Sequence, residues 1–158
     1  MIKKRIYLDA TIPNYMFDAR ERLKVFVEFT QKWWQEERHH YEIWASEETL
    51  HEVGTGEYPH KVQAIEFASK IPLLPPHPEI IEIAQVYIDH YVMPLALKGD
   101  ALHLAYASFY KMDFLLTWNW NHLANANKKQ HIAVINTRLQ LAIPEIITPL
   151  QLFQEETL

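Results

Sequence analysis

Segments typical of short strands alternate with segments of helical periodicity along this chain. Residues 4–8, 41–46 and 113–117 are short runs rich in β-branched or aromatic side chains, and turn-forming or polar residues bound them. Between the first two runs, apolar residues recur near helical spacing over residues 22–37. This alternation predicts an α/β fold, in which helices cover both faces of a parallel sheet and the connections are right-handed.

Further helices are expected in the rest of the chain. Pro13 can open one helix, and Ser46 is a plausible N-cap for the helix that carries Glu52 and ends near Gly54. The apolar pattern predicts other helices over residues 58–70, 79–91, 98–111 and 122–129. Prolines interrupt the short extended segment 71–78, and from Ile132 onward short apolar runs alternate with Pro144 and Pro149.

The composition favours one globular domain spanning residues 1–158. The chain is 49% hydrophobic and 22% charged, which is ordinary for such a domain. It has no cysteine, so a disulfide framework, a zinc–thiolate site and a cysteine nucleophile are excluded. Without an apolar run long enough for a membrane span or a recognisable signal peptide, we expect a cytoplasmic protein with no membrane partner. The net charge of −5 argues against wrapping nucleic acid by general attraction.

Polar residues stand where the predicted strands end or the following helices begin. Asp9 ends the first strand, Glu52 lies on the helix after the second, Asp100 begins a helix and Asn119 follows the strand near residue 116. In parallel sheets, ligands bind at the carboxyl ends of the strands, so these side chains are expected to converge. Converging carboxylates repel one another unless a cation compensates, and oxygen ligands suit Mg²⁺ and Mn²⁺. The pattern therefore favours a metal site that can activate water and neutralise a phosphate.

Each acidic residue also has a simpler interpretation. Asp9 can cap a turn, Asp100 can stabilise the first turn of its helix, and Glu52 can be a solvated helix residue. The agreement of residue type and position along the whole chain is what favours the metal site.

Four motifs carry a resemblance to a known family. They are "YLDATIPNY", "SEETLHEV", "GDALHLAYA" and "DFLLTWNWNHLANA", and the ending "IPEIITPLQLF" adds to them. In this order they resemble PIN-domain proteins, specifically the VapC-like toxins of type II toxin–antitoxin pairs, over about residues 6–149. The resemblance implies a three-layer α/β/α fold with a mostly parallel sheet of about four to five strands. It also implies a Mg²⁺- or Mn²⁺-dependent ribonuclease, with Asp9, Glu52 and Asp100 as the metal ligands, a small cognate antitoxin and a homodimer.

Asn119 departs from the pattern of that family, which places an acid in this position. An amide oxygen can bind Mg²⁺ or hold a metal-bound water, but it adds no negative charge. We therefore expect weaker metal binding than four acids would give. The alternative is that Asn119 is simply a turn residue.

Other polar residues near these motifs are weaker candidates. His103 lies one helical turn after Asp100 and can orient a carboxylate, contact a phosphate or simply be packed. Thr11, close to Asp9, can touch the metal site or cap a helix. Trp118 and Trp120 flank the proposed site, where one of them could stack on a base. The remaining candidates for substrate binding or support of the site are Thr117, Asn121 and His122.

These observations lead us to expect an endoribonuclease whose catalytic residues are Asp9, Glu52, Asp100 and Asn119. The first alternative is a catalytically silent PIN-like module that binds RNA or a protein partner, and a phosphatase-like hydrolase acting on small molecules is a weaker one. The chain has no glycine-rich phosphate loop and no nucleophile-elbow motif, so nucleotide-cofactor enzymes and serine hydrolases have little support.

Overall fold

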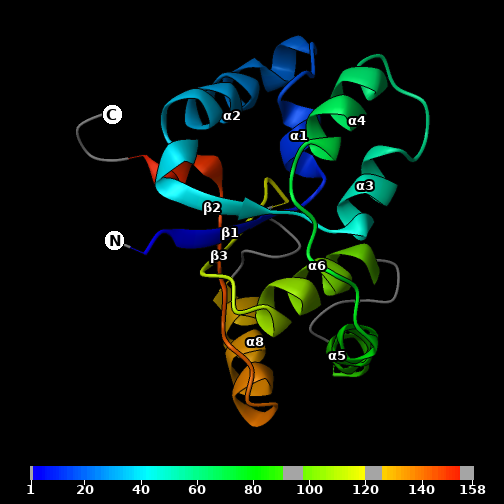
Figure 1. Ribbon diagram of the computed structural model, residues 1–158, viewed down its shortest axis with the longest axis vertical. Helices are drawn as coiled ribbons and strands as arrows, with labels where there is room; N and C mark the ends of the chain where they lie inside the picture. Colours follow the sequence, from blue (N-terminus) through cyan, green and yellow to red (C-terminus); the bar gives the residue numbers. More distant parts are fainter. Residues whose placement is uncertain (1, 91–97, 120–125, 154–158) are drawn as a thin grey trace.

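A computed structural model describes residues 2–90, 98–119 and 126–153. Its four described strands form one parallel sheet in the order β2-β1-β3-β4. The strands are β1 (Lys4–Leu8), β2 (Tyr41–Trp44), β3 (Phe114–Leu116) and β4 (Glu145–Ile147). Helices lie on both sides of this sheet, so the expected three-layer α/β/α architecture is confirmed (Figure 1).

The helices follow the periodic segments of the sequence closely. They are α1 (Thr11–Tyr15), α2 (Lys24–Glu36), α3 (Glu47–Val53), α4 (Lys61–Ser69), α5 (Pro78–Asp89), α6 (Lys98–Phe109) and α8 (Ala126–Arg138), with 3-10 turns η1 (Glu21–Leu23), η2 (Arg38–His40) and η4 (Pro149–Leu152). Ser46 caps α3 through a reciprocal capping box with Thr49, as its position predicted. Within the described ranges, no helix has the length and apolar character needed to cross a bilayer.

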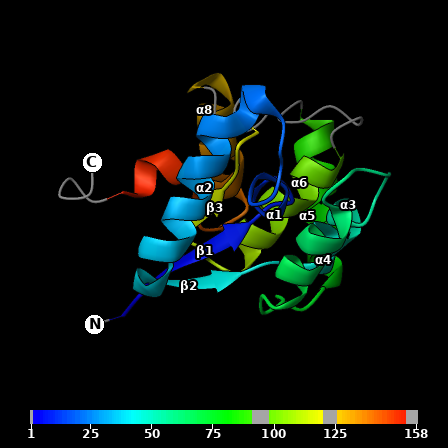
Figure 2. The same cartoon turned by 90° about the horizontal axis from the view of Figure 1, so that it is seen from above.

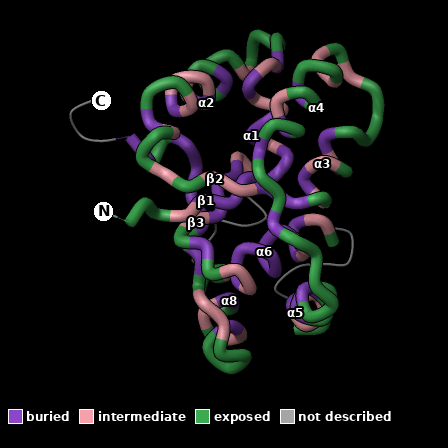
Figure 3. Tube along the Cα trace, viewed as in Figure 1, coloured by how far each residue is buried: buried purple, intermediate pink, exposed green. Residues whose placement is uncertain are grey.

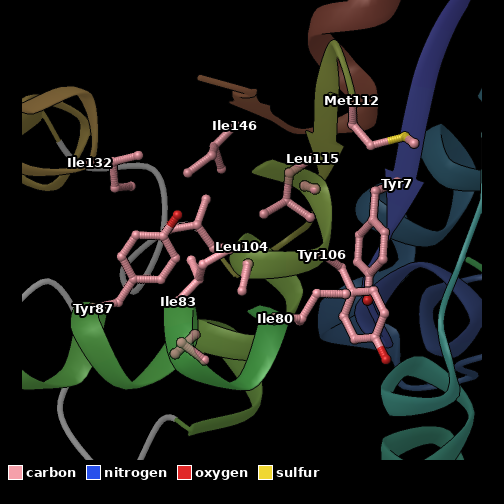
Figure 4. Packing of buried hydrophobic residues seen from close by; sticks show 14 of the residues in the cluster. Tyr7, Ile80, Ile83, Tyr87, Leu104, Tyr106, Met112, Leu115, Ile132 and Ile146 are labelled. Carbon is pink, nitrogen blue, oxygen red and sulfur yellow. The ribbon is translucent and has the colours of Figure 1, made fainter. Parts of the chain in front are cut away.

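Alternate residues of each central strand face opposite layers. Ile6 and Leu8 of β1 pack in the cluster that contains Trp33 of α2, whereas Tyr7 packs with α5 and α6. Figure 4 shows the second cluster, in which Leu115 lies among side chains from both helices and from α8. With both faces covered, β1 is buried along most of its length (Figure 3).

Helix α8 differs most from the sequence expectation. α8 extends to Arg138, well beyond the short helix that was predicted to end near residue 129. Its β-branched residues weaken the helical signal, but Ile132 and Asn136 are buried against the fold, and this tertiary packing outweighs local propensity. The proline-interrupted segment after α4 is extended as predicted, and Leu73 forms an isolated parallel bridge with Ala45.

The order of the strands positions the site. The second strand, β2, pairs with one edge of β1. The chain then crosses over, and β3 pairs with the opposite edge of β1. The direction of winding therefore reverses between β1 and β3, and ligands of open α/β sheets bind at the carboxyl ends of such a pair. The arrowheads of β1 and β2 point toward α1, α3 and α4, which border this edge (Figure 2).

Candidate functional site

Asp9, directly after β1, is held by two threonines. Thr11 donates its backbone N–H, at 3.0 Å, and its hydroxyl to Asp9 Oδ1. From the end of β3, the Thr117 hydroxyl donates to Asp9 Oδ2. Asp9 is almost fully buried, so these donors fix a carboxylate that water cannot solvate.

Asn119 connects this carboxylate to the next one. Its backbone N–H donates to Thr117 Oγ1 at 2.8 Å, and its side-chain Nδ2 donates to Asp100 Oδ2 at 3.0 Å. A hydrogen-bonded chain thus runs from Asp9 through Thr117 and Asn119 to Asp100. An aspartate at position 119 would repel Asp100 where the amide now donates to it.

Glu52 is held by a buried histidine of α6. Nε2 of His103 lies 2.9 Å from Glu52 Oε1, and Nδ1 lies 2.6 Å from the Tyr7 hydroxyl. In the neutral imidazole, Nε2 carries the proton that Glu52 accepts, and Nδ1 accepts from Tyr7. His103 has no exposed surface, so its role in this structure is to orient a carboxylate and not to contact solvent-borne phosphate.

The start of α6 allows Glu52 to approach closely. A Cβ atom added to Gly99 would lie 2.2 Å from Glu52 Oε1, so a side chain there would displace this carboxylate. Glu48, one turn earlier on α3, lies against the same position, with its Oε1 3.4 Å from that Cβ. Burial, together with the charge of Glu52, raises the pKa of Glu48. Because position 99 is glycine, Glu48 and Glu52 of α3 can lie against the start of α6, next to Asp100.

The electrostatics of the site depend on burial and on charge clustering. Burial raises the pKa of Asp9 to about 6, the charge of Asp100 adds to this rise, and His103 with the two threonines opposes it. Burial alone would lower the pKa of His103, but its hydrogen bond to Glu52 and the charges of Glu52, Asp9 and Asp100 raise it. Burial acts to raise the pKa of Glu52, yet the bond from His103 and its charge lower it. The surrounding carboxylates thus favour the protonated form of His103, whose positive charge offsets part of theirs.

The oxygen-rich side chains of the site have the donor types that a divalent cation needs. Carboxylate and amide oxygens converge at one sheet edge, which is the donor chemistry that Mg²⁺ and Mn²⁺ prefer. In the described ranges, however, no three histidine, aspartate or glutamate side chains are grouped as ligands of a single ion. The donor types match a hard cation: Asp9 and Asp100 are linked through Thr117 and Asn119, and Glu52 is bonded to His103.

The structure therefore brings together Asp9, Thr11, Glu52, Asp100, His103, Thr117 and Asn119. Asn121, His122 and Trp120 lie outside the described residues. Trp118 is fixed by a hydrogen bond from its Nε1 to Thr30 at 2.7 Å, and its ring stacks on Tyr15 with centroids 6.1 Å apart.

Sequence reasoning missed the residues that support His103 and Glu52. Tyr7 lies on β1, two residues before Asp9, and its hydroxyl also contacts Ser46 Oγ at 2.6 Å. Glu48 lies four residues before Glu52, on the same face of α3. The spacing of two residues from Asp9 along the strand direction, and of four residues from Glu52 on a helix, could have pointed to Tyr7 and Glu48.

No protein-family model matches this chain, and no curated protein matches its sequence significantly.

Proposed function

We propose that this protein is a metal-dependent endoribonuclease that hydrolyses RNA phosphodiester bonds, as the toxin of a toxin–antitoxin pair. The observation that carries the proposal is the hydrogen-bonded chain that links Asp9 to Asp100 at the reversal point of the sheet, with Glu52 fixed beside it. Two buried carboxylates, Asp9 and Asp100, are costly for the fold, which supports a role in function.

The residues that would hold Mg²⁺ or Mn²⁺ are Asp9 and Asp100 directly, with Glu52 acting directly or through water. When bound, the ion would lower the pKa of water and neutralise charge on the phosphate. Asn119 and Thr117 set the separation of the two aspartates, and His103 sets the position of Glu52. The chain itself needs no nucleophile, since water adds across the P–O bond and the leaving oxygen departs with a proton.

The proposal includes two protein partners, a small cognate antitoxin and a second copy of the chain in a homodimer, in the cytoplasm. The resemblance to VapC-like toxins supports both. Co-expression with a small neighbouring reading frame, followed by light scattering, measures the stoichiometry with and without that partner.

Asp100→Asn tests the assignment of the site. The variant should keep its fold, because an amide occupies the same volume, yet cleavage of structured RNA in Mn²⁺ should fall by at least about 100-fold once a direct metal ligand is lost. Asp89→Asn is the matched control, since Asp89 is exposed on α5 and accepts a local hydrogen bond from Gln85. Undiminished cleavage by Asp100→Asn, with chelator abolishing the wild-type activity, would show that the metal site lies elsewhere.

A catalytically silent module that binds RNA or a protein is the second candidate. One observation favours it: Asp9 and Asp100 already accept hydrogen bonds from Thr11, Thr117 and Asn119, so the site is satisfied without an ion. Calorimetric titration with Mn²⁺ separates the two candidates. Saturable binding that Asp9→Asn removes supports the enzyme, and no heat at millimolar metal supports the silent module.

A further inference from the structure

A second cavity, of about 470 Å³, opens where the start of α3, the start of α5 and one face of α6 meet. Its volume lies within the range of small-ligand sites. The residues that matter for binding are Glu47, Glu48, His77, Ile81, Leu102 and Tyr106. Asp9, Glu52 and Asp100 do not line this cavity, so a ligand there does not depend on the proposed ribonuclease.

Tyr106 brings an unpartnered hydroxyl to this cavity. The residue is only 4% exposed, yet its hydroxyl keeps contact with solvent and forms no hydrogen bond within the described part of the chain. In Figure 4 the hydroxyl end of Tyr106 points away from Leu104 and Leu115 of the core. Native proteins leave few largely buried polar groups without a partner, so this hydroxyl is available to a ligand.

Two carboxylates lie near the Tyr106 hydroxyl. Burial raises the pKa of Tyr106 to about 12, and the charges of Glu47, Tyr110 and Glu48 add to this rise. The phenol is therefore neutral at physiological pH, and the negative charge of the cavity comes from the two glutamates. A cation that reaches the hydroxyl would be attracted by both of them.

The protein supplies no fixed cation to this cavity. Among the described residues of its walls, none is a lysine or an arginine. His77 Nδ1 accepts the backbone N–H of Glu79 at 3.1 Å, so this nitrogen carries no proton and the ring is neutral in the structure. The same ring stacks on Phe109, with centroids 4.9 Å apart. The cavity therefore combines negative charge with largely apolar walls, which complements a cation on an apolar stem.

We propose that this cavity binds a small aliphatic amine. Its ammonium group would lie between the Tyr106 hydroxyl and the carboxylates of Glu47 and Glu48. An ammonium group has three donors, so it can satisfy the phenol oxygen and both carboxylates together. The hydrocarbon stem would cover the exposed side chain of Ile81 and the half-buried Leu102, which removes apolar surface from water.

Matched head groups test the site without metal and without RNA. Hexylamine, hexan-1-ol and hexanoate share one stem, and each is titrated into the whole chain in chelator and followed by ligand-observed NMR. Salt at about 0.15 M screens general attraction to the net charge of −5. Hexylamine should bind at least about tenfold more tightly than the alcohol or the acid, because only the amine forms charge-assisted hydrogen bonds with the glutamates. Propylamine should bind more weakly, since its shorter stem buries less apolar surface.

Two variants locate the binding in this cavity. Glu48→Gln and Tyr106→Phe should each weaken hexylamine binding about three- to tenfold. Glu28→Gln removes the same charge from an exposed position on α2, so it is the matched control and should leave the affinity unchanged. Tyr106→Phe removes a hydroxyl that has no partner, so its melting temperature should equal or exceed that of wild type. Its loss of binding then cannot come from unfolding.

Equal affinity for hexylamine, hexan-1-ol and hexanoate would overturn the amine site, as would an equal loss of binding in Glu28→Gln. Tighter binding of Nα-acetyl-lysine methylamide than of every free amine would assign the cavity to a lysine of a protein partner in place of a small amine. RNA cleavage by a protein that does not bind hexylamine rejects the amine site alone. Amine binding by a protein that cleaves no RNA supports the amine site and rejects only the ribonuclease.

Discussion

At the residue scale, the buried carboxylate of Asp9 lowers the stability of the folded protein at neutral pH. Its pKa is raised to about 6 by burial and by the charge of Asp100. An acid whose pKa is higher in the folded than in the unfolded protein favours folding only while it is protonated. Its contribution is therefore complete below its unfolded pKa of 3.8 and is lost as the pH rises through about 6.

Asp9→Asn should consequently stabilise the metal-free protein at neutral pH. Relative to wild type, the free energy of unfolding of the variant should rise between pH 4 and pH 7 by up to about 3 kcal/mol, from the linkage between pKa and stability. Urea unfolding of both proteins in chelator at the two pH values measures this difference. A difference that is the same at both pH values would show that Asp9 titrates normally in the folded protein.

Asn119 is the second residue whose chemistry can be separated by substitution. Asn119→Asp removes the donor to Asp100 and adds a like charge, so in chelator it should destabilise the protein by about 1–3 kcal/mol. With Mn²⁺, the extra charge should tighten binding on the order of tenfold, since ligand charge tunes affinity. Asn119→Ala removes the donor without adding charge, so it should lower both the free energy of unfolding in chelator and the affinity for Mn²⁺. Calorimetric titration tests this contrast, and weaker Mn²⁺ binding by Asn119→Asp than by Asn119→Ala would contradict it.

At the element scale, the approach of α3 to the start of α6 decides where Glu52 lies. Only glycine at position 99 leaves space for the Glu52 carboxylate, which His103 then holds from the next turn of α6. The two helices therefore act together, although neither contains a complete site.

Gly99→Ala should reduce RNA cleavage while leaving the stability of the fold nearly unchanged. The added methyl group displaces the flexible end of Glu52, while alanine favours the helix, so the free energy of unfolding should change by no more than about 1 kcal/mol. RNA cleavage should fall about 10- to 100-fold, as when a supporting group of a metal site is lost. Gly54→Ala, at the end of α3, is the control, and full activity in Gly99→Ala would show that Glu52 need not lie there.

At the scale of the whole molecule, the site exists only when the sheet is assembled. Its residues follow β1 and β3 or lie on α3 and α6, so the unfolded chain has no equivalent arrangement. A ligand that binds only the folded state raises stability by mass action.

Mn²⁺ should therefore stabilise the wild-type protein. At a free concentration of about 100 times the dissociation constant, the gain is about 2.7 kcal/mol. For a chain of this size, that gain corresponds to roughly 5–10 °C in melting temperature. Differential scanning calorimetry measures this shift, and the double variant Asp9→Asn, Asp100→Asn should lack it. An equal shift in the double variant would indicate binding elsewhere on the surface.

The sequence by itself predicted the α/β class, most elements, and the convergence of the polar residues at one sheet edge. Strand alternation and helical periodicity are local properties, and parallel strands bring their carboxyl ends together whatever the loops between them. It failed for α8, where burial of Ile132 and Asn136 outweighs a weak helical pattern.

Only the tertiary structure decided which groups touch. It brought the Asn119 amide to Asp100 as a hydrogen-bond donor, and it placed His103 between Glu52 and Tyr7. These contacts join residues from different elements, many of them distant in sequence, and depend on side-chain direction and on burial. Neither property follows from residue spacing, because each is fixed by the packing of the whole chain.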